Sequence, residues 1–368
     1  MPIETDRPGR ILIVRLSAFG DVVHCLPLLD ALRRARPEAE IGWVVEEKAA
    51  SLLEGHPQID RLWVLPRARI EAHVRSFQIV SALRVLWGFL RELRAAGYEL
   101  VIDAHCNLRA SLTGLLSGAP RRIGFSKTFA KEGAQHLLTE HVEPRKEAPL
   151  KVQRTLELLR PLGIDGADAR PKLAIPDAAR ARAEERLGKR TGAQVVAMHP
   201  GVSGIGAIKQ WEPARYAAVA RRLADEAGLR SVVTWGPGER ALAEEVVAAS
   251  AGAAQIGPET GSILDLAALL AASDLVIGSD SGPLHLAAAL GVPVVGLYGP
   301  KDPEVYGPWD ARTGEVGRVV RRPVHCSPCT LRTCSNWICM PAIQVDDVVA
   351  AALEELGRHL PRAGASAH

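Results

Sequence analysis

The segment that decides the fold is ILIVRL at Ile11–Leu16, which ends in the turn sequence SAFGD at residues 17–21. Residues 22–35 then carry an apolar pattern with helical spacing. A short, continuously apolar strand followed directly by a helix is typical of a parallel sheet that helices cover on both faces. This opening therefore predicts a doubly wound α/β unit.

The same alternation of strand and helix runs through the chain twice. In the first half we expect strands at 41–45, 61–65, 99–103 and 121–125, and helices at 76–96, 108–117 and 148–161. In the second half we expect strands at 194–198, 231–235, 274–278 and 292–298, and helices at 177–190, 213–227, 238–250, 262–272 and 283–290. Between them, residues 163–176 are rich in Gly, Pro and Asp and are typical of a linker.

We therefore predict two Rossmann-like domains of class α/β, at residues 1–172 and 173–344, which face each other across a cleft. Residues 345–368 form a last amphipathic helix and a tail, which we expect to pack back toward the first domain. Ligands of doubly wound folds lie outside the carboxyl ends of the strands, so the loops at those ends are the candidates for chemistry.

Composition excludes several classes of protein. The 368 residues are 47% hydrophobic and 24% charged, which is a globular composition and not a disordered one. No apolar run approaches the roughly 20 residues of a membrane span, and the N-terminus lacks the apolar stretch of a secretory signal. We expect a cytoplasmic protein with reduced cysteines.

Charge is spread unevenly along the chain. Residues 1–190 carry 31 Lys and Arg against 24 Asp and Glu, whereas residues 191–368 carry 14 against 18. The first half thus suits an anionic partner better, unless the difference is ordinary surface variation. Aromatic residues are not interleaved with the basic ones, so no nucleic-acid partner is expected.

The loop after the first strand carries Gly20 and Asp21. Gly20 allows a tight turn, and Asp21 is a favoured helix N-cap. The functional alternative is a carboxylate at the carboxyl end of a strand, placed to act as a general base. His24, one turn further along, either binds substrate or lies on the surface.

The loop at 199–211 follows the first strand of the second domain. Its glycines allow close approach of a ligand, while Ser203 offers a hydroxyl and Lys209 a positive charge, a combination that suits a phosphate. The spacing matches neither a P-loop nor a GxGxxG fingerprint, and a plain flexible turn is the alternative.

Two further loops of the second domain carry candidate residues. Ser281, Gly282 and the following proline begin a helix well, so its free N–H groups would point at a diphosphate. Asp280 suits sugar hydroxyls or a cap, and His285 suits a phosphate or core packing. Glu239 either accepts from ribose hydroxyls or is a surface residue at a helix start.

Two clusters have a structural and a functional interpretation. A zinc site, an iron–sulfur cluster, reduced thiols and a disulfide are all possible at the C-terminal cysteines, and metal is the less favoured interpretation. These cysteines are Cys326, Cys329, Cys334 and Cys339. Basic loop residues of the first domain form an anionic acceptor site or are simply solvated. They include Arg67, Arg69, Arg121, Arg122 and Lys127.

Taken together, these motifs resemble the lipopolysaccharide heptosyltransferases, glycosyltransferase family 9, which have the GT-B fold. The resemblance spans residues 11 to about 345 and keeps the family's order of motifs. It rests on Arg15-Leu16-Ser17-x-x-Gly20-Asp21-x-x-His24-x-x-Pro27, Trp43-Val44-Val45-Glu46-Glu47, the 199–211 loop, Asp280-Ser281-Gly282-x-x-His285 and Tyr298-Gly299-Pro300. The first two motifs are most similar to heptosyltransferase I, and the cysteine segment is similar to some heptosyltransferase II sequences.

The resemblance implies a role for each matching residue. It makes Asp21 the catalytic base, and it puts Ser203 and Lys209 on the nucleotide diphosphate. Glu239 falls near the ribose-binding acid, and Asp280 matches the residue on the donor sugar. The turn on the phosphates matches Ser281, Gly282 and His285. Residues expected to bind the acceptor are Gly20, His24, Arg67, Arg69, Arg121, Arg122 and Lys127.

The implied reaction is an inverting transfer of heptose from ADP-L-glycero-D-manno-heptose to the Kdo/inner-core region of lipopolysaccharide, with no metal or other cofactor required. Its partners would be Kdo-lipid A and the inner leaflet, with the enzyme peripherally associated with the inner membrane. The alternatives are heptosyltransferase II or another family 9 transferase with a different acceptor, a GT-B-like sugar-nucleotide epimerase or hydrolase, and a non-catalytic carbohydrate-binding protein.

Overall fold

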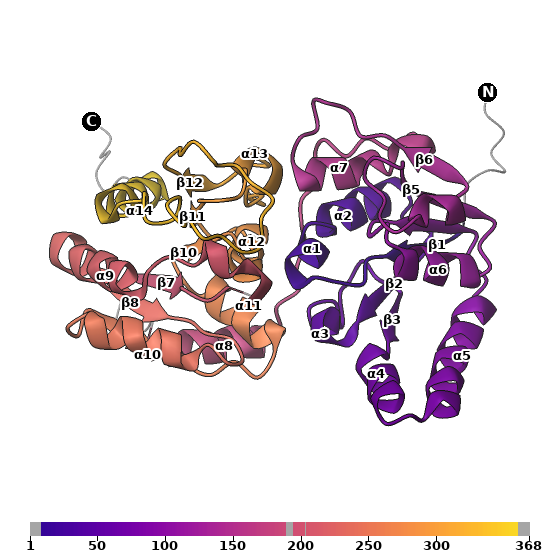
Figure 1. The fold of residues 1–368 in the computed structure, drawn as a ribbon, viewed down its shortest axis with the longest axis horizontal. Helices are drawn as coiled ribbons and strands as arrows, with labels where there is room; N and C mark the ends of the chain where they lie inside the picture. The colour runs from indigo at the N-terminus through magenta and orange to yellow at the C-terminus, as the bar shows by residue number, and fades with distance from the viewer. Residues whose placement is uncertain (1–8, 189–193, 203, 360–368) are drawn as a thin grey trace, which may run out of the picture. The chain divides into compact units, whose positions relative to one another are not determined.

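The computed structural model describes residues 9–188, 194–202 and 204–359 (Figure 1). The chain divides into two compact units, Met1–Ala174 and Ile175–His368, and the division falls inside the Gly-, Pro- and Asp-rich segment. Each unit contains one six-stranded sheet whose strand pairs are all parallel. The predicted α/β class is confirmed.

The first unit is built around a central strand, β1 (Arg10–Val14), that is buried except at its first residue. Its strands are β1 Arg10–Val14, β2 Glu40–Glu46, β3 Arg61–Leu65, β4 Leu100–Asp103, β5 Arg121–Phe125 and β6 Glu140–Val142. They lie in the order β3-β2-β1-β4-β5-β6. Its helices are α1 Phe19–Val23, α2 Leu26–Ala35, α3 Glu47–Ala50, α4 Arg67–Arg75, α5 Ile79–Ala95, α6 Leu108–Leu116 and α7 Lys151–Glu157. Because β1 lies between β2 and β4, Ile11–Val14 are buried on both faces, as the apolar run predicts.

The second unit repeats this strand order. Its strands are β7 Val195–His199, β8 Arg230–Val233, β9 Ala254–Ile256, β10 Leu275–Ser279, β11 Val294–Leu297 and β12 Arg318–Val320, arranged as β12-β11-β10-β7-β8-β9. Its helices are α8 Asp177–Arg186, α9 Pro213–Ala227, α10 Arg240–Ala249, α11 Ile263–Ala271, α12 Gly282–Ala289, α13 Pro303–Tyr306 and α14 Val345–His359. A 3-10 helix, η5, covers Gly204–Lys209. In both units the third strand is at one edge and the first and fourth are central, as in Rossmann folds.

The last helix contributes to the core of the second unit. Val348, Val349 and Ala352 of α14 pack in one cluster with Val295 and Leu297 of β11. The apolar face of α14 is thereby used within this unit. The predicted packing of residues 345–368 toward the first domain stays a prediction. Residues 360–368 of that prediction lie outside the described residues.

Short elements at the sheet edges were not predicted. The strands β6, β9 and β12 have three residues each, and none carries a run of apolar residues long enough to stand out from a loop. The helix α4 was also missed, because it has no buried residue and so no core-facing pattern.

Among the described residues, the structure has no helix that is both long and apolar enough to cross a bilayer.

Candidate functional site

In the first unit, the chemistry-bearing residues gather where β1 and β4 end. The Arg15 guanidinium, directly after β1, donates to the Ala104 carbonyl at 2.6 Å. His105, just after β4, accepts at Nδ1 from the Leu16 N–H at 3.3 Å. These contacts follow from the pairing of β1 with β4, since parallel neighbours end at the same sheet edge.

Asp21 lies in α1 beside these residues and is held by two cations. One carboxylate oxygen pairs with the Arg15 guanidinium and the other with the ammonium of Lys151 at the start of α7. Burial alone would raise the pKa of Asp21, but the charges of Arg15, Lys151 and His24 outweigh it and hold that pKa well below its usual range. Asp21 is therefore ionised throughout the physiological pH range.

Two residues of this cluster escaped the sequence analysis. Lys151 is 130 positions from its partner Asp21, and no motif marks it. His105 follows a predicted strand, which is the one feature that could have singled it out. Burial, with the nearby charge of Arg15, lowers the pKa of His105 to about 3. It is therefore a neutral imidazole beside the Asp21 ion pairs.

Several residues predicted to bind an acceptor lie at this edge of the sheet. Gly20 belongs to α1 and His24 is its C-cap. Arg67 begins α4, directly after β3, and its guanidinium lies 3.0 Å from the buried Glu46 carboxylate and 2.6 Å from Glu71. Two others are exposed, Arg69 on α4 and Lys127 in the turn after β5.

Arg121 and Arg122, also predicted to bind the acceptor, lie apart from this group. They begin β5, and their partners across the sheet are the first residues of β4, so they lie at its opposite, amino-terminal edge. The Arg121 guanidinium pairs with Glu140, and Arg122 donates to the Leu137 carbonyl at 2.8 Å. Both residues therefore connect β5 to the neighbouring segment around β6.

In the second unit, three predicted donor-site residues form one network. Lys209 Nζ donates to the Asp280 carbonyl at 2.6 Å and lies 3.1 Å from Asp280 Oδ2. His285 Nε2 lies 3.1 Å from Asp280 Oδ1. Burial would raise the pKa of Asp280, but His285 and Lys209 lower it to about 2. Asp280 thus remains an anion that positions one cation and one imidazole.

The amino end of α12 lies beside this network. Ser281 is its N-cap, Gly282 its first residue, and a proline follows within its first turn. The Ser281 hydroxyl oxygen is buried and has no hydrogen-bond partner among the described residues. With the unpaired N–H groups of a first helical turn, this arrangement suits an anionic ligand.

Glu239 lies near the end of β7 as the N-cap of α10. Its Oε2 accepts from the Gly236 N–H at 2.8 Å and lies 3.5 Å from Nε2 of the buried His199. Burial raises the pKa of Glu239 and lowers that of His199 to about 4. A Cβ at Gly201 would come within 2.3 Å of the Glu239 carboxyl, so this packing requires glycine there.

Ser203, also predicted to bind the diphosphate, lies outside the described residues.

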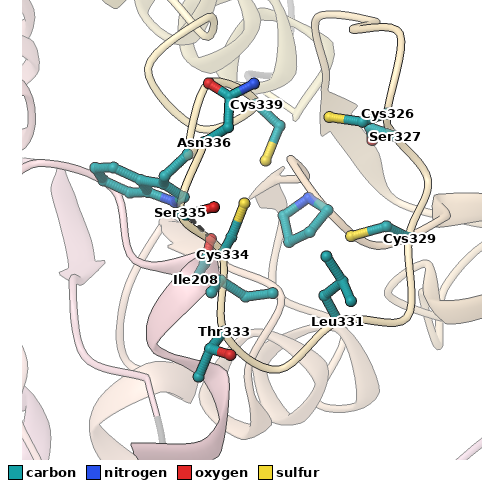
Figure 2. A pocket seen from close by; sticks show the side chains of 12 residues that line it. Ile208, Cys326, Ser327, Cys329, Leu331, Thr333, Cys334, Ser335, Asn336 and Cys339 are labelled. Atoms are coloured by element: carbon teal, nitrogen blue, oxygen red, sulfur yellow. Dashed lines mark hydrogen bonds between the residues drawn. The ribbon is translucent and has the colours of Figure 1, made fainter.

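Figure 2 shows the four C-terminal cysteines around a cavity of about 260 Å³, with Cys326 and Cys329 on one side and Cys334 and Cys339 on the other. All four are free thiols. Among the described residues, no three His, Cys, Asp or Glu side chains are grouped so as to hold a metal ion.

The cysteine segment at 326–339 is hydrogen-bonded to two loops of the second unit. Trp337 Nε1 donates to the Ile208 carbonyl at 2.8 Å, next to Lys209. The Cys329 N–H donates to the Pro300 carbonyl at 2.7 Å, in the loop after β11. The segment therefore supports the residue that precedes Lys209.

Comparison with known proteins identifies the family of this chain. The family profile of glycosyltransferase family 9 (heptosyltransferase) matches residues 86–338, more than half of the chain. The chain belongs to glycosyltransferase family 9.

Among curated relatives, lipopolysaccharide heptosyltransferase 1 of Pseudomonas aeruginosa is 29% identical over 89% of this chain and 87% of its own length. Lipopolysaccharide heptosyltransferase 3 of Escherichia coli is 26% identical over 95% and 98%. The relatives thus include more than one type of heptosyltransferase.

Two solved structures share the fold. A family 9 glycosyltransferase from Veillonella parvula has a TM-score of 0.79 at 25% identity and covers 95% of this chain and 98% of its own. The E. coli heptosyltransferase WaaC, solved with ADP, has a TM-score of 0.72 at 25% identity and covers 94% and 99%.

Proposed function

We propose that this protein transfers heptose from ADP-L-glycero-D-manno-heptose to the Kdo region of lipopolysaccharide, with inversion at the anomeric carbon. The observation that carries the proposal is the Lys209–Asp280–His285 network beside the amino end of α12, in a chain of the heptosyltransferase family. Relatives named heptosyltransferase 1, and a neighbour solved with ADP, support this donor.

The second unit stabilises the leaving diphosphate. As the bond from the anomeric carbon to the phosphate oxygen breaks, negative charge grows on the ADP. Lys209 and the N–H groups of α12 supply positive charge and donors that are in place before the reaction, and the buried Ser281 hydroxyl adds another donor. These groups can supply the stabilisation without a metal ion, and Asp280 keeps Lys209 oriented.

The first unit supplies the base. Asp21 accepts the proton of the attacking hydroxyl, and a single displacement then inverts the anomeric centre. With Arg15 and Lys151 both paired to it, Asp21 is a weak base. An acceptor that carries carboxylates or phosphates competes for those two cations. Its binding therefore raises the pKa of Asp21 when the hydroxyl arrives.

Two alternatives remain distinct from this proposal. A different acceptor within the family is compatible with relatives of types 1 and 3. A sugar-nucleotide hydrolase or epimerase would process the donor with no acceptor at all.

Because the proposed acceptor is anchored in a bilayer, the proposal also places the enzyme at the cytoplasmic face of the inner membrane.

The test is ADP release from ADP-heptose, with and without Kdo-lipid A. The proposal expects release that depends on the acceptor. Acceptor-independent release would support hydrolysis or epimerisation instead. Release that needs an already heptosylated acceptor would keep the transferase but move it to a later step.

A further inference from the structure

The helices α4 and α5 carry a group of large apolar side chains on their outer surface. Figure 1 shows the two helices side by side, projecting from the sheet edge that ends in β3. We call this group the α4–α5 patch. It consists of Val74, Phe77, Ile79, Val80, Leu83 and Trp87. Phe77 is 91% exposed, and Val80 and Trp87 are each 70% exposed.

The patch is distinct from the core-facing side of α5. At 3.6 residues per turn, Ile79, Val80, Leu83 and Trp87 fall on one face of the helix. The buried residues Ala82 and Leu93 follow a neighbouring stripe, and Leu93 packs in the core of the first unit. The helix α5 therefore carries apolar residues that pack in the core, and it carries a second apolar stripe that is exposed. Soluble monomers rarely leave such a contiguous patch exposed without a use for it.

The surroundings of the patch are basic. Residues 67–95 contain six arginines and two glutamates, a net charge of +4. Arg75 lies at the end of α4, next to Phe77, while Arg84 and Arg91 flank the exposed stripe of α5 on the side away from the core. All three are exposed. A large apolar stripe with Trp and Phe, bordered by arginines, is the pattern of helices that lie in the headgroup region of anionic bilayers.

We propose that the α4–α5 patch is the surface through which this protein docks on an anionic phospholipid bilayer. The proposal rests on the proposed function, because an acceptor anchored in a bilayer requires the enzyme to work at its surface. A second copy of the chain fits less well. A symmetric dimer would place the +4 segment against its own copy, and like charges across an interface disfavour association.

The first experiment is co-sedimentation of the full chain with vesicles of phosphatidylethanolamine and phosphatidylglycerol. The test variant combines Phe77→Ser, Val80→Ser and Trp87→Ser, whose side chains are exposed, so folding is preserved. The matched control combines Ile256→Ser and Val316→Ser, two exposed apolar side chains of the second unit. We expect the control to bind like the wild type and the test variant to lose more than about tenfold in partition coefficient.

The second experiment tests the charge. Arg84→Glu with Arg91→Glu lowers partition into vesicles that contain phosphatidylglycerol, by about fivefold for each arginine lost. The same pair of substitutions has little effect on the weaker binding to phosphatidylcholine alone.

The outcomes separate this inference from the proposed function. No binding of the wild type to phosphatidylglycerol vesicles would overturn the docking surface and leave transfer to a water-soluble Kdo acceptor intact. A dimer in light scattering that the triple serine variant abolishes would assign the patch to a second copy. Vesicle binding that depends on the patch, without acceptor-dependent ADP release, would support the docking surface and count against the proposed function.

Discussion

At the scale of single residues, the site contains two carboxylates, and each is paired with basic side chains. Asp21 lies between two cations and Asp280 between a cation and an imidazole. The sequence could predict both carboxylates because each follows a strand in a recognisable motif. It could not predict Lys151, because a partner 130 residues away is chosen by the fold. The sequence also did not show that Arg121 and Arg122 lie at the opposite edge of the sheet, since residue type does not tell which end of a strand a residue occupies.

Asp21→Asn tests the base directly. We expect kcat to fall by roughly 10²–10⁴-fold, because a general base acts in the transition state. The affinity for ADP-heptose should stay within about twofold, because the donor residues belong to the other unit. Initial rates and calorimetric titration measure the two quantities. Normal turnover in this variant would remove Asp21 from the mechanism.

Lys151→Gln tests the partner that the sequence analysis missed. Burial raises the pKa of Asp21, whereas the two cations lower it. Removal of one cation therefore moves that pKa upward. The carboxylate then becomes protonated at a higher pH, and the acidic limb of the kcat/KM profile moves to higher pH. Lys146→Gln, at an exposed lysine of the same unit, is the matched control and should leave the limb in place. An unchanged profile in Lys151→Gln would show that the ion pair does not control the reaction.

Lys209→Gln tests the donor site. The ammonium is replaced by a neutral amide of similar length, so we expect ADP to bind roughly tenfold to a hundredfold more weakly, the loss typical of one charge-assisted contact. Lys301→Gln is the control, since Lys301 donates to the Cys329 carbonyl in the same unit. Isothermal titration with ADP compares the two variants, and equal affinities would exclude Lys209 from the phosphates.

At the scale of elements, predictability follows burial. The strands β1, β4, β7 and β10 are central and covered on both faces, so their apolar runs identify them from the sequence. The edge strands β6, β9 and β12 are shorter and partly exposed, and their pattern is lost among loops. The helix α4 was missed for the same reason, because nothing on it is buried.

Gly42→Ala should be strongly destabilising. A Cβ on this residue of β2 would lie 2.0 Å from the Tyr98 hydroxyl oxygen, which itself accepts from Trp63 Nε1 at 2.7 Å. We expect a loss of about 1–3 kcal/mol in the free energy of unfolding, because a packed core must move. Urea denaturation measures it.

Gly88→Ala is the matched substitution in α5. No atom lies within 4 Å of its added Cβ, and the position is interior to a helix. We expect a gain of about 0.5–1 kcal/mol from reduced freedom of the unfolded chain. A similar loss at both glycines would contradict the packing described for Tyr98.

At the scale of the whole molecule, the sequence was sufficient for the family and for two Rossmann-like units in order. It was not sufficient for the type of heptosyltransferase, because relatives of types 1 and 3 both match and the distinction depends on the acceptor. The sequence also could not predict which unit α14 packs against. An amphipathic helix shows that one face is buried but does not show against which unit.

Hydrogen exchange with ADP tests the division of roles between the units. We expect slower exchange at residues 280–285, where the first turn of α12 would donate to the diphosphate. We expect no change in α7 of the first unit. Protection centred on α1 and α7 instead would place the nucleotide on the other unit.

The repeated strand order has a consequence for how such enzymes diversify. Asp21 and His105 follow β1 and β4, and Lys209 and Asp280 follow β7 and β10, which are the central neighbours in each sheet. The proposed base and the proposed donor-site residues thus lie on the loops after the central strands, where the strand order of each sheet reverses. The loops and helices after the outer strands, α4 and α5 after β3 among them, can change in length and surface character during evolution. Enzymes that descend from one ancestor can therefore acquire new acceptors or new locations in the cell, while the transfer reaction stays the same.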